Sequence, residues 1–451
     1  HKPALNRIMI TASRAGNALR RLYCCSACGK RRSALREVLH LDYYLLTDLA
    51  ATMGYHLAMS GAETFRVEDT IHRILRAYGV ECEVFAIPNC VSVSLEAANG
   101  KPLMIMRRIG FHGNDLEKLE KLNALSRCIC AQQPSVDEAM AWLRETLAAC
   151  RTYPTGVGYL GNALVGLGFC LVFGGTLLDC LWAGVMGLII GLVTRFMDKR
   201  EANPFFSTIL ASCLMALPAY AAAGLGLLNS PDAAIIGALM ILVPGLLVTN
   251  SMRDIIYGDT NSGIFRIVQV LLSALAIALG TAAAWHLTAG LYGQTGSATV
   301  SWPPLAQAAA VFVGCCGFCI LFNTHGRGCV LCIIGGVATW MLYLLWGALG
   351  CDVYAANLFA ALFAALYAEG MARIRKCPAT PYLVIAVLPL LPGAGVYYTM
   401  SLGLEGNMMD AVGKGLETIG IAGALAVGIL LVSTVFRLAN RWELGRNAPH
   451  I

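Results

Sequence analysis

Apolar residues dominate the chain after residue 152, in long windows that carry no charged side chain. The windows are 152–178, 180–194, 202–231, 233–252, 267–326, 328–351, 353–368, 377–404 and 418–436. The polar segment 293–304 divides the longest of them into two. A helix that crosses a bilayer needs about 20 apolar residues, so the pattern predicts about ten transmembrane helices.

Residues 35–152 show a different pattern, with short periodic segments and frequent charges. Apolar residues recur every three or four positions from Ser33 to Met59, which predicts a helix, and a second helix follows Ser60-Gly61 and ends at Gly79. Segments 82–87, 90–97 and 102–109 predict an antiparallel meander of three strands. A helix over 115–130 follows, then a last helix that begins with a capping box of Ser135 and Glu138. This part is predicted to be an α+β domain.

Composition agrees with a membrane protein, because 57% of the residues are hydrophobic and only 13% are charged. Residues 1–34 form a basic, cysteine-containing tail, which predicts contact with anionic lipid rather than with nucleic acid. Its first residues lack the apolar core of a secretory signal, so we expect the α+β domain to stay in the cytosol.

The 18 cysteines are interpreted as small apolar residues, and neither a cofactor nor a metal is predicted. Cys24, Cys25 and Cys28 could supply three metal ligands, but no second cluster follows at the spacing of a zinc site.

Basic residues are concentrated in alternate loops of the apolar part. Arg195, Lys199 and Arg200 lie in one such loop, and Arg253, Arg266, Arg327, Arg373, Arg375 and Lys376 lie in later ones. The intervening loops hold almost no Lys or Arg. By the positive-inside rule, both termini are expected in the cytosol.

Two short motifs repeat at nearly the same offset. GFCLVF at 168–173 recurs as GFCILF at 317–322, and Pro244-Gly245 recurs as Pro392-Gly393. The offsets, 149 and 148 residues, predict two copies of a five-helix unit, 153–292 and 303–440. Because five is an odd number, the second copy is expected to be inverted in the membrane, as in many transporters.

Each Pro-Gly pair lies inside an apolar window and predicts a broken helix. A mere kink is the alternative. Amide groups that begin the second half of each helix could bind a carboxylate. The predicted substrate site comprises Pro244, Gly245, Thr249, Asn250, Ser251, Pro392, Gly393, Tyr397, Tyr398 and Thr399.

Acidic residues near these breaks are candidates for proton coupling, namely Asp254, Asp259 and Glu369. The alternative for Asp254 is an ordinary interfacial pair with Arg253. In the α+β domain, Glu63, Arg66 and Glu68 are functional candidates that could bind a solute or dock on the helices. The alternative is that Glu63 and Arg66 simply pair on a solvated helix face. The chain has no G-x-S-x-G, P-loop or H-E-x-x-H motif, so an enzyme is not expected.

Several stretches resemble the bacterial threonine/serine exporter family. They are GAETFRVEDTIHRILRAYG, PNCVSVSLEA, DLEKLEKLNALSR, LVPGLLVTNSMRDIIYGDTNSG and the later LLPG, within residues 40–437. The resemblance implies a multi-pass protein of the bacterial cytoplasmic membrane, with a cytosolic domain before ten helices. It also implies a small amino acid as substrate, or a C4-dicarboxylate such as succinate, which related two-protein members are reported to export.

We therefore expect a secondary exporter of a small carboxylate-bearing solute, with threonine or serine ahead of succinate. Exchange against protons by alternating access is the expected mechanism. A channel, and a membrane-tethered sensor or enzyme led by the α+β domain, are the alternatives. The expected partners are the solute, protons and the lipid bilayer, and the sequence leaves a homo-oligomer open.

Overall fold

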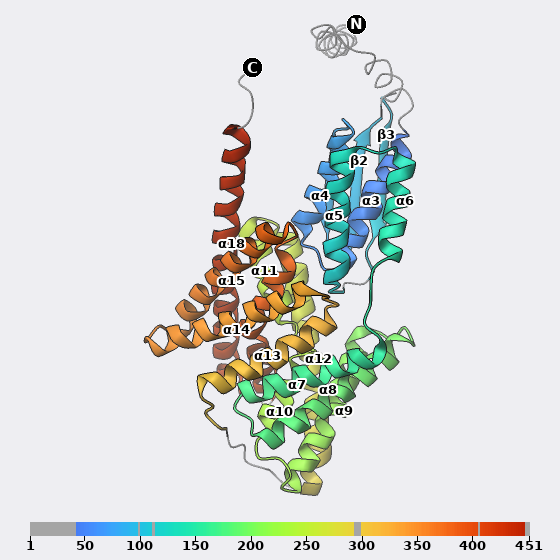
Figure 1. Cartoon of the computed structure of the whole chain (residues 1–451). Coiled ribbons are helices and arrows are strands. Elements are labelled where there is room, and N and C mark those ends of the chain that lie inside the picture. The colour runs from blue at the N-terminus through green and yellow to red at the C-terminus, as the bar shows by residue number, and fades with distance from the viewer. Residues whose placement is uncertain (1–41, 98–99, 111–112, 293–298, 405, 447–451) are drawn as a thin grey trace, which may run out of the picture.

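The computed structural model describes residues 42–97, 100–110, 113–292, 299–404 and 406–446. An N-terminal part, residues 42–152, lies at one end of a larger helical part, residues 153–446 (Figure 1). The basic tail and the cluster of Cys24, Cys25 and Cys28 lie outside the described residues.

The N-terminal part has the seven segments predicted from the sequence, which in chain order are two helices, three strands and two helices. Its elements are α3 (Tyr43–Met59), α4 (Thr64–Ala77), β1 (Cys82–Ile87), β2 (Cys90–Glu96), β3 (Pro102–Arg108), α5 (Leu116–Gln132) and α6 (Val136–Ala148). The strands pair antiparallel in the order β1-β2-β3, which confirms the meander. The capping box of α6 is also confirmed, because Ser135 accepts a hydrogen bond from the Glu138 amide and Glu138 accepts one from the Ser135 amide.

Burial of α3 and α4 against each other and against the sheet forms much of the core of this part. Leu46, Leu49 and Met53 of α3 and Ile71 and Ile74 of α4 are fully buried. Every second residue of β2 is buried, as expected for a sheet with one face covered. Removing this much apolar surface from water gives the part a hydrophobic core of its own.

The helical part comprises twelve α-helices and one short 3-10 turn among its described residues. They are α7 (Thr155–Val172), α8 (Leu177–Asp198), α9 (Pro204–Gly224), α10 (Pro231–Leu239), α11 (Gly245–Tyr257), α12 (Thr260–Tyr292), α13 (Pro304–Leu321), α14 (Arg327–Ala348), α15 (Val353–Arg375), α16 (Thr380–Val387), η1 (Leu388–Leu390), α17 (Gly393–Leu404) and α18 (Met408–Arg446).

Fewer helices than the ten expected are long and apolar enough to count as candidate spans among the described residues. Eight described helices are long and apolar enough to cross a membrane, and α16 with α17, bent by 46°, adds a ninth. The window 233–252, predicted as the fourth span, is instead divided between α10 and α11, each shorter than a bilayer is thick. Pro244 has no amide hydrogen to donate, and the five residues from Met240 to Pro244 lie outside both helices.

The helices of the two halves pack in corresponding ways. α7 packs along α8 and α13 along α14, while α9 packs along α12 and α15 along α18. The halves meet mainly where α7 packs on α13, and where α11 packs on α18 and α12 on α17.

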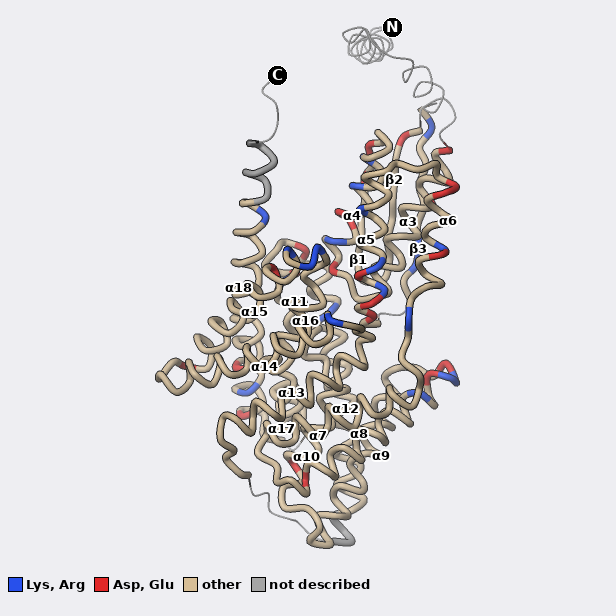
Figure 2. Tube along the Cα trace, viewed as in Figure 1, with Lys and Arg blue, Asp and Glu red and all other residues tan. Residues whose placement is uncertain are grey.

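Charged side chains are distributed unevenly along the molecule (Figure 2). They are frequent over the N-terminal part and where it meets the helical part, whereas most of the helical part carries few. The first residues of α3 and the last turns of α18 lie at the same end of the molecule (Figure 1).

Candidate functional site

The two Pro-Gly breaks lie against each other in the middle of the helical part. A Cβ atom on Gly245 would lie 2.9 Å from Leu391 Cβ and 3.7 Å from Gly393 Cα. A Cβ atom on Gly393 would lie 2.9 Å from Val243 Cγ1. The two distances of 2.9 Å are shorter than a real Cβ contact, so glycine at both positions allows the two breaks to approach.

The first amide of each second half-helix is already hydrogen-bonded. Gly245 N–H donates to the Val243 carbonyl at 2.9 Å, and Gly393 N–H donates to the Leu391 carbonyl at 2.7 Å. The first bond of helical type in α11 runs from Val248 N–H to the Pro244 carbonyl. The amides of residues 246 and 247 are therefore the ones that the start of α11 can offer to an anion.

A cavity of about 820 Å³ lies beside the breaks and reaches the N-terminal part. Four predicted substrate residues line it, namely Pro244, Gly245, Asn250 and Gly393. The other six, Thr249, Ser251, Pro392, Tyr397, Tyr398 and Thr399, are not among its lining residues.

Two of those six already have their hydroxyl groups engaged. The Ser251 hydroxyl donates to the Val248 carbonyl at 2.7 Å, and the Thr399 hydroxyl donates to the Gly395 carbonyl at 2.7 Å. Each hydrogen bond stays within one helix, so these hydroxyl groups are used by the backbone of their own helix.

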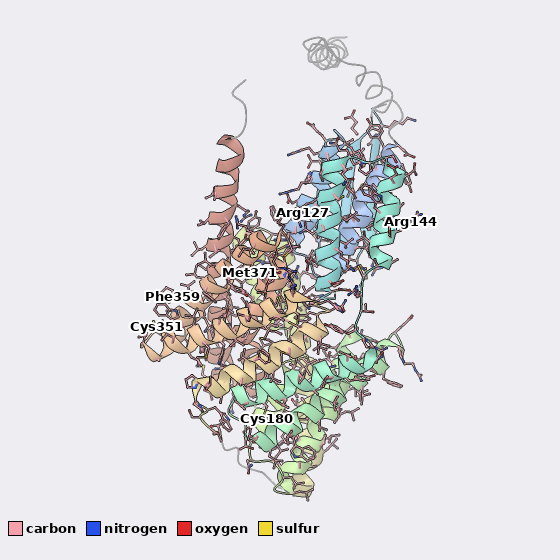
Figure 3. All side chains as sticks on the ribbon, viewed as in Figure 1. Arg127, Arg144, Cys180, Cys351, Phe359 and Met371 are labelled. Atoms are coloured by element: carbon pink, nitrogen blue, oxygen red, sulfur yellow. The ribbon has the colours of Figure 1, made fainter. Side chains whose placement is uncertain are left out.

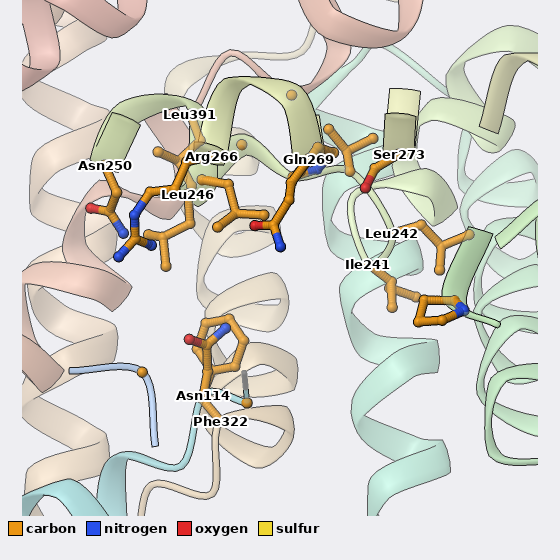
Figure 4. A pocket seen from close by; sticks show the side chains of 18 of the residues that line it. Asn114, Ile241, Leu242, Leu246, Asn250, Arg266, Gln269, Ser273, Phe322 and Leu391 are labelled. Atoms are coloured by element: carbon orange, nitrogen blue, oxygen red, sulfur yellow. The ribbon is translucent and has the colours of Figure 1, made fainter. Parts of the chain in front are cut away.

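A row of polar side chains on α12 completes the cavity. Arg266, Gln269 and Ser273 follow one another at helical spacing and point into it (Figure 4). Asn250 of α11 and Asn114 of the N-terminal part add amide groups. This row is not among the residues predicted from the sequence, because Arg266 resembles a loop charge there, although three polar residues on one face of an apolar helix are a signal for it.

Ion pairs around the cavity differ from those expected. Arg266 Nε lies 2.9 Å from Asp254 Oδ2, and Arg253 Nη1 lies 3.1 Å from Glu63 Oε1. The alternative of an Asp254 pair with Arg253 is therefore wrong. The Glu63 pair with Arg66 is wrong as well, because Glu63 precedes α4 with an extended backbone and reaches the helical part instead.

A second, smaller cavity of about 150 Å³ gathers most of the predicted charged candidates. Asp254, Glu369, Glu63 and Arg66 all line it, although they come from three different helices or their ends, α11, α15 and α4. Arg253 and Glu63 also line the larger cavity, so the two cavities share a wall. Within the described ranges, no group of three or more His, Cys, Asp or Glu side chains could hold a metal ion.

The remaining two candidates stabilise local structure. Asp259 Oδ1 accepts a hydrogen bond from Ser262 N–H at 3.4 Å, at the first turn of α12. Glu68 accepts one from Ala86 N–H at 2.9 Å and so ties α4 to β1, and burial raises the pKa of Glu68. Neither residue lines the two cavities.

The N-terminal part contacts the helical part at a second place as well. Leu116 N–H donates to the Phe322 carbonyl at 2.9 Å, and Asn323 donates to Asp115 Oδ1 at 3.0 Å. Arg127, on the side of α5 that faces the helices (Figure 3), donates to the Lys376 carbonyl at 2.9 Å. At the other contact, the ion pair of Glu63 with Arg253, two effects oppose each other. Burial alone would raise the pKa of Glu63, but the positive charges of Arg253 and Arg66 outweigh burial, so the pKa of Glu63 is lowered.

Known proteins that resemble the chain are transporters. The family model described as "Putative threonine/serine exporter" matches residues 48–288, more than half of the chain, and a second model, "Threonine/Serine exporter", matches 307–435. A "Probable threonine/serine exporter" of Mycobacterium tuberculosis is 25% identical, over 89% of this chain and 78% of its own length. No solved structure matches the chain.

Two further relatives extend this picture. The "Threonine/serine exporter" of Corynebacterium glutamicum is 24% identical, over 87% of this chain and 83% of its own. The "Probable succinate transporter subunit YjjP" of Escherichia coli is 23% identical and corresponds to 52% of this chain and 91% of its own. With its long apolar helices, this chain is a multi-pass helical membrane protein, and it belongs to the threonine/serine exporter family.

Proposed function

We propose that the chain is a secondary active exporter of a small solute that carries a carboxylate. The observation that carries this proposal is the position of Arg266, with other polar side chains, in a largely apolar cavity beside two broken helices. A guanidinium group binds a carboxylate through two parallel hydrogen bonds. Gln269, Ser273 and Asn250 can then hydrogen-bond the rest of the solute.

Threonine or serine is the leading substrate, and a C4-dicarboxylate such as succinate is the alternative. The names of the two longer relatives support the amino acid, and the name of the succinate transporter subunit supports the alternative. The cavity carries both signs of charge, from Arg266, Arg253 and Glu63. This mixture suits the carboxylate and ammonium groups of an amino acid, whereas a dicarboxylate would require Arg253 to leave Glu63.

Alternating access between two inverted halves is the proposed mechanism. A Cβ on Gly161 would lie 3.2 Å from the Gly317 carbonyl oxygen, and one on Gly168 would lie 2.6 Å from the Ala310 carbonyl oxygen. Residues 310 and 317 are the equivalents of 161 and 168 at the offset of 149. This exchange of partners is the contact that a two-fold axis between the halves would produce, and it supports the inverted repeat.

The orientation proposed is with the N-terminal part and both termini in the cytosol of a bacterium. The distribution of basic residues supports it, as does the common end at which α3 begins and α18 ends. In this orientation the larger cavity faces the cytosol, from which an exporter takes its solute. We propose three domains for the described residues, namely residues 42–152 in the cytosol and the two halves of the helical part in the membrane.

Counterflow in proteoliposomes tests this function. The purified protein, loaded inside with unlabelled threonine, serine, alanine or succinate, is given the labelled form of the same solute outside. Threonine or serine should exchange fastest. Exchange of succinate alone would replace the leading substrate by the alternative, and no exchange of any of the four would contradict the proposal.

The same counterflow assay, made with residues 1–150 deleted, tests whether the N-terminal part takes part in transport or acts as a membrane-tethered sensor. Because Glu63 and Asn114 line the cavity, the deletion should impair exchange of the solute. Undiminished exchange would show that the N-terminal part does not contribute to the site.

A further inference from the structure

The smaller cavity lies where the N-terminal part meets four helices of the helical part. Its lining residues come from α4 and the residue before it, and from α11, α15, α16 and α18. At about 150 Å³ it has room for a small ion and some water. Of the described residues, neither Arg266 nor the glycines of the two breaks, Gly245 and Gly393, line it. The proposed solute site therefore leaves this cavity unexplained.

The charges around this cavity do not balance. Each of the three acids that line it is paired with an arginine. The pairs, with their N–O distances, are Glu63–Arg253 at 3.1 Å, Asp254–Arg266 at 2.9 Å and Glu369–Arg373 at 3.1 Å. Two further arginines line the cavity, Arg66 and Arg437, and neither is in an ion pair with a described residue. Asp259, beside Asp254, offsets one of these two charges, so a positive charge remains.

Arg437 is held in place without a carboxylate. Its Nη1 donates to the Tyr257 hydroxyl at 2.7 Å, and its Cζ lies 5.0 Å from the centre of the Tyr257 ring and 5.5 Å from that of Phe65. Aromatic rings attract a guanidinium group without neutralising its charge. Because a guanidinium group has more N–H groups than these contacts use, Arg437 can also donate to an anion.

A buried hydroxyl group on the wall of the same cavity has no partner. Thr380 lines the cavity and is only 4% exposed, and its Oγ1 has no hydrogen-bond partner among the described residues. Buried polar atoms are seldom left so, since an unpaired hydroxyl costs free energy. A ligand in the cavity that accepts a hydrogen bond would satisfy it.

The start of α16 favours a ligand of negative charge. α16 begins at Thr380, and Ala379 before it has no side chain that could cap the first amides. The Leu383 amide donates to the Ala379 carbonyl, so the amides before Leu383 are the uncapped ones. These amides carry the positive end of the helix dipole.

We propose that the smaller cavity binds a small inorganic anion, such as chloride or phosphate. Arg66 of α4, Arg437 of α18 and the Thr380 hydroxyl of α16 are its ligands. The anion contacts the N-terminal part and two helices of the helical part together, so it strengthens the docking of the N-terminal part. It is a bound component and not the transported solute, so this inference does not rest on the proposed function.

Thermal unfolding of the full-length protein in a neutral detergent tests the site. Sodium gluconate, whose bulky anion serves as the reference, is replaced stepwise by sodium chloride or sodium phosphate at constant ionic strength. We expect the melting temperature to rise and to saturate, because a ligand that binds only the folded protein stabilises it. In Arg66→Gln and in Arg437→Gln the half-saturating concentration should be at least roughly tenfold higher, since each variant loses a charged hydrogen bond.

Thr380→Val separates binding of an anion from a merely structural role. In gluconate this variant should unfold at the temperature of the wild type or above it, because an unpaired buried hydroxyl is removed. Its half-saturating concentration of chloride should nevertheless rise roughly fivefold. Arg195→Gln is the control, since it removes an exposed arginine near the end of α8 and should leave that concentration unchanged. If Arg437→Gln does not fold, Arg66→Gln and Thr380→Val decide.

Two kinds of result would overturn the anion site. One is a melting temperature of the wild type that does not respond to chloride or phosphate, or a response of the same half-saturating concentration in Arg66→Gln, Arg437→Gln and Thr380→Val. The other is stabilisation by added phosphatidylglycerol but by neither inorganic anion, which would assign the two arginines to a lipid headgroup. Counterflow of the solute is measured separately, so either result would leave the proposed function standing.

Discussion

Glu63 of the N-terminal part lies 3.1 Å from Arg253 of α11, between Oε1 and Nη1, and both residues line both cavities. Their side chains are 25% and 11% exposed. The contact therefore connects the N-terminal part with the half-helix that begins at the first Pro-Gly break.

We expect this ion pair to hold the N-terminal part on the helices. A double-mutant cycle tests this, with the variants Glu63→Gln, Arg253→Gln and both together. The measured quantity is the rate of hydrogen exchange of the backbone amides at the start of α4. A charged hydrogen bond of this kind contributes about 1.5–3 kcal/mol, so each single variant should expose these amides, and the double variant should add little. Full additivity of the two single effects would show that the pair is not coupled.

The contribution of this pair should depend on pH in one direction. Because the pKa of Glu63 is lowered in the docked state from its ordinary value of 4.5, docking is fully stabilised above that value. Stabilisation is lost as the pH falls through the lowered pKa, where Glu63 takes up its proton. Hydrogen exchange measured along an acid series should show this loss in the wild type and not in Glu63→Gln.

Gly245 should tolerate no side chain, because the second break fills the space beside it. Gly245→Ala is expected to abolish transport and to destabilise the protein by about 1–3 kcal/mol through overpacking. Gly347→Ala is the matched control, since Gly347 lies within a helix and a Cβ there would meet nothing within 4 Å. Counterflow and thermal unfolding measure the two effects. Normal exchange by Gly245→Ala would show that the contact between the breaks is not needed.

Gln269 should contribute to binding of the solute rather than to folding. Gln269→Leu keeps the approximate size but removes both hydrogen-bonding groups from the cavity. We expect the KM for solute to rise roughly tenfold, the cost of about 1.4 kcal/mol for a lost hydrogen bond, with little change in the melting temperature. Asn261→Ala, on an exposed turn of the same helix, is the control. An unchanged KM for Gln269→Leu would remove this residue from the site.

Asp179 should prove structural although it is a buried acid among apolar helices. Asp179→Asn cannot accept all the hydrogen bonds that now reach the carboxylate from Thr176 and Asn229. Unfolding should become easier by about 1–3 kcal/mol. The KM for threonine in counterflow should not change, and a changed KM would assign Asp179 to the transport pathway.

Much of the fold could be predicted because local patterns decide it. The strands, the capping box at Ser135 and the breaks at Pro244 and Pro392 follow from residue types within a few positions, and the structure confirms them. The number of candidate spans is lower than expected because length in sequence does not reveal where Pro244 divides a window into two short helices.

The site was harder to predict because it depends on contacts between distant residues. Glu63 and Arg253 are 190 positions apart, and Arg266 pairs with a residue on another helix rather than with one in its own loop. The sequence could indicate that Gly245 and Gly393 correspond, since both follow a proline at the same offset. It could not indicate that the polar row from Arg266 to Ser273 would face them.

Accumulation of threonine in proteoliposomes under an imposed pH gradient tests most directly whether the protein is a secondary active transporter. With the lumen more acidic than the outside, we predict that labelled threonine rises inside above its outside concentration as protons leave, and that a proton ionophore abolishes this accumulation. Equilibration without accumulation in either direction of the pH gradient would contradict the account, because it is the behaviour of a channel.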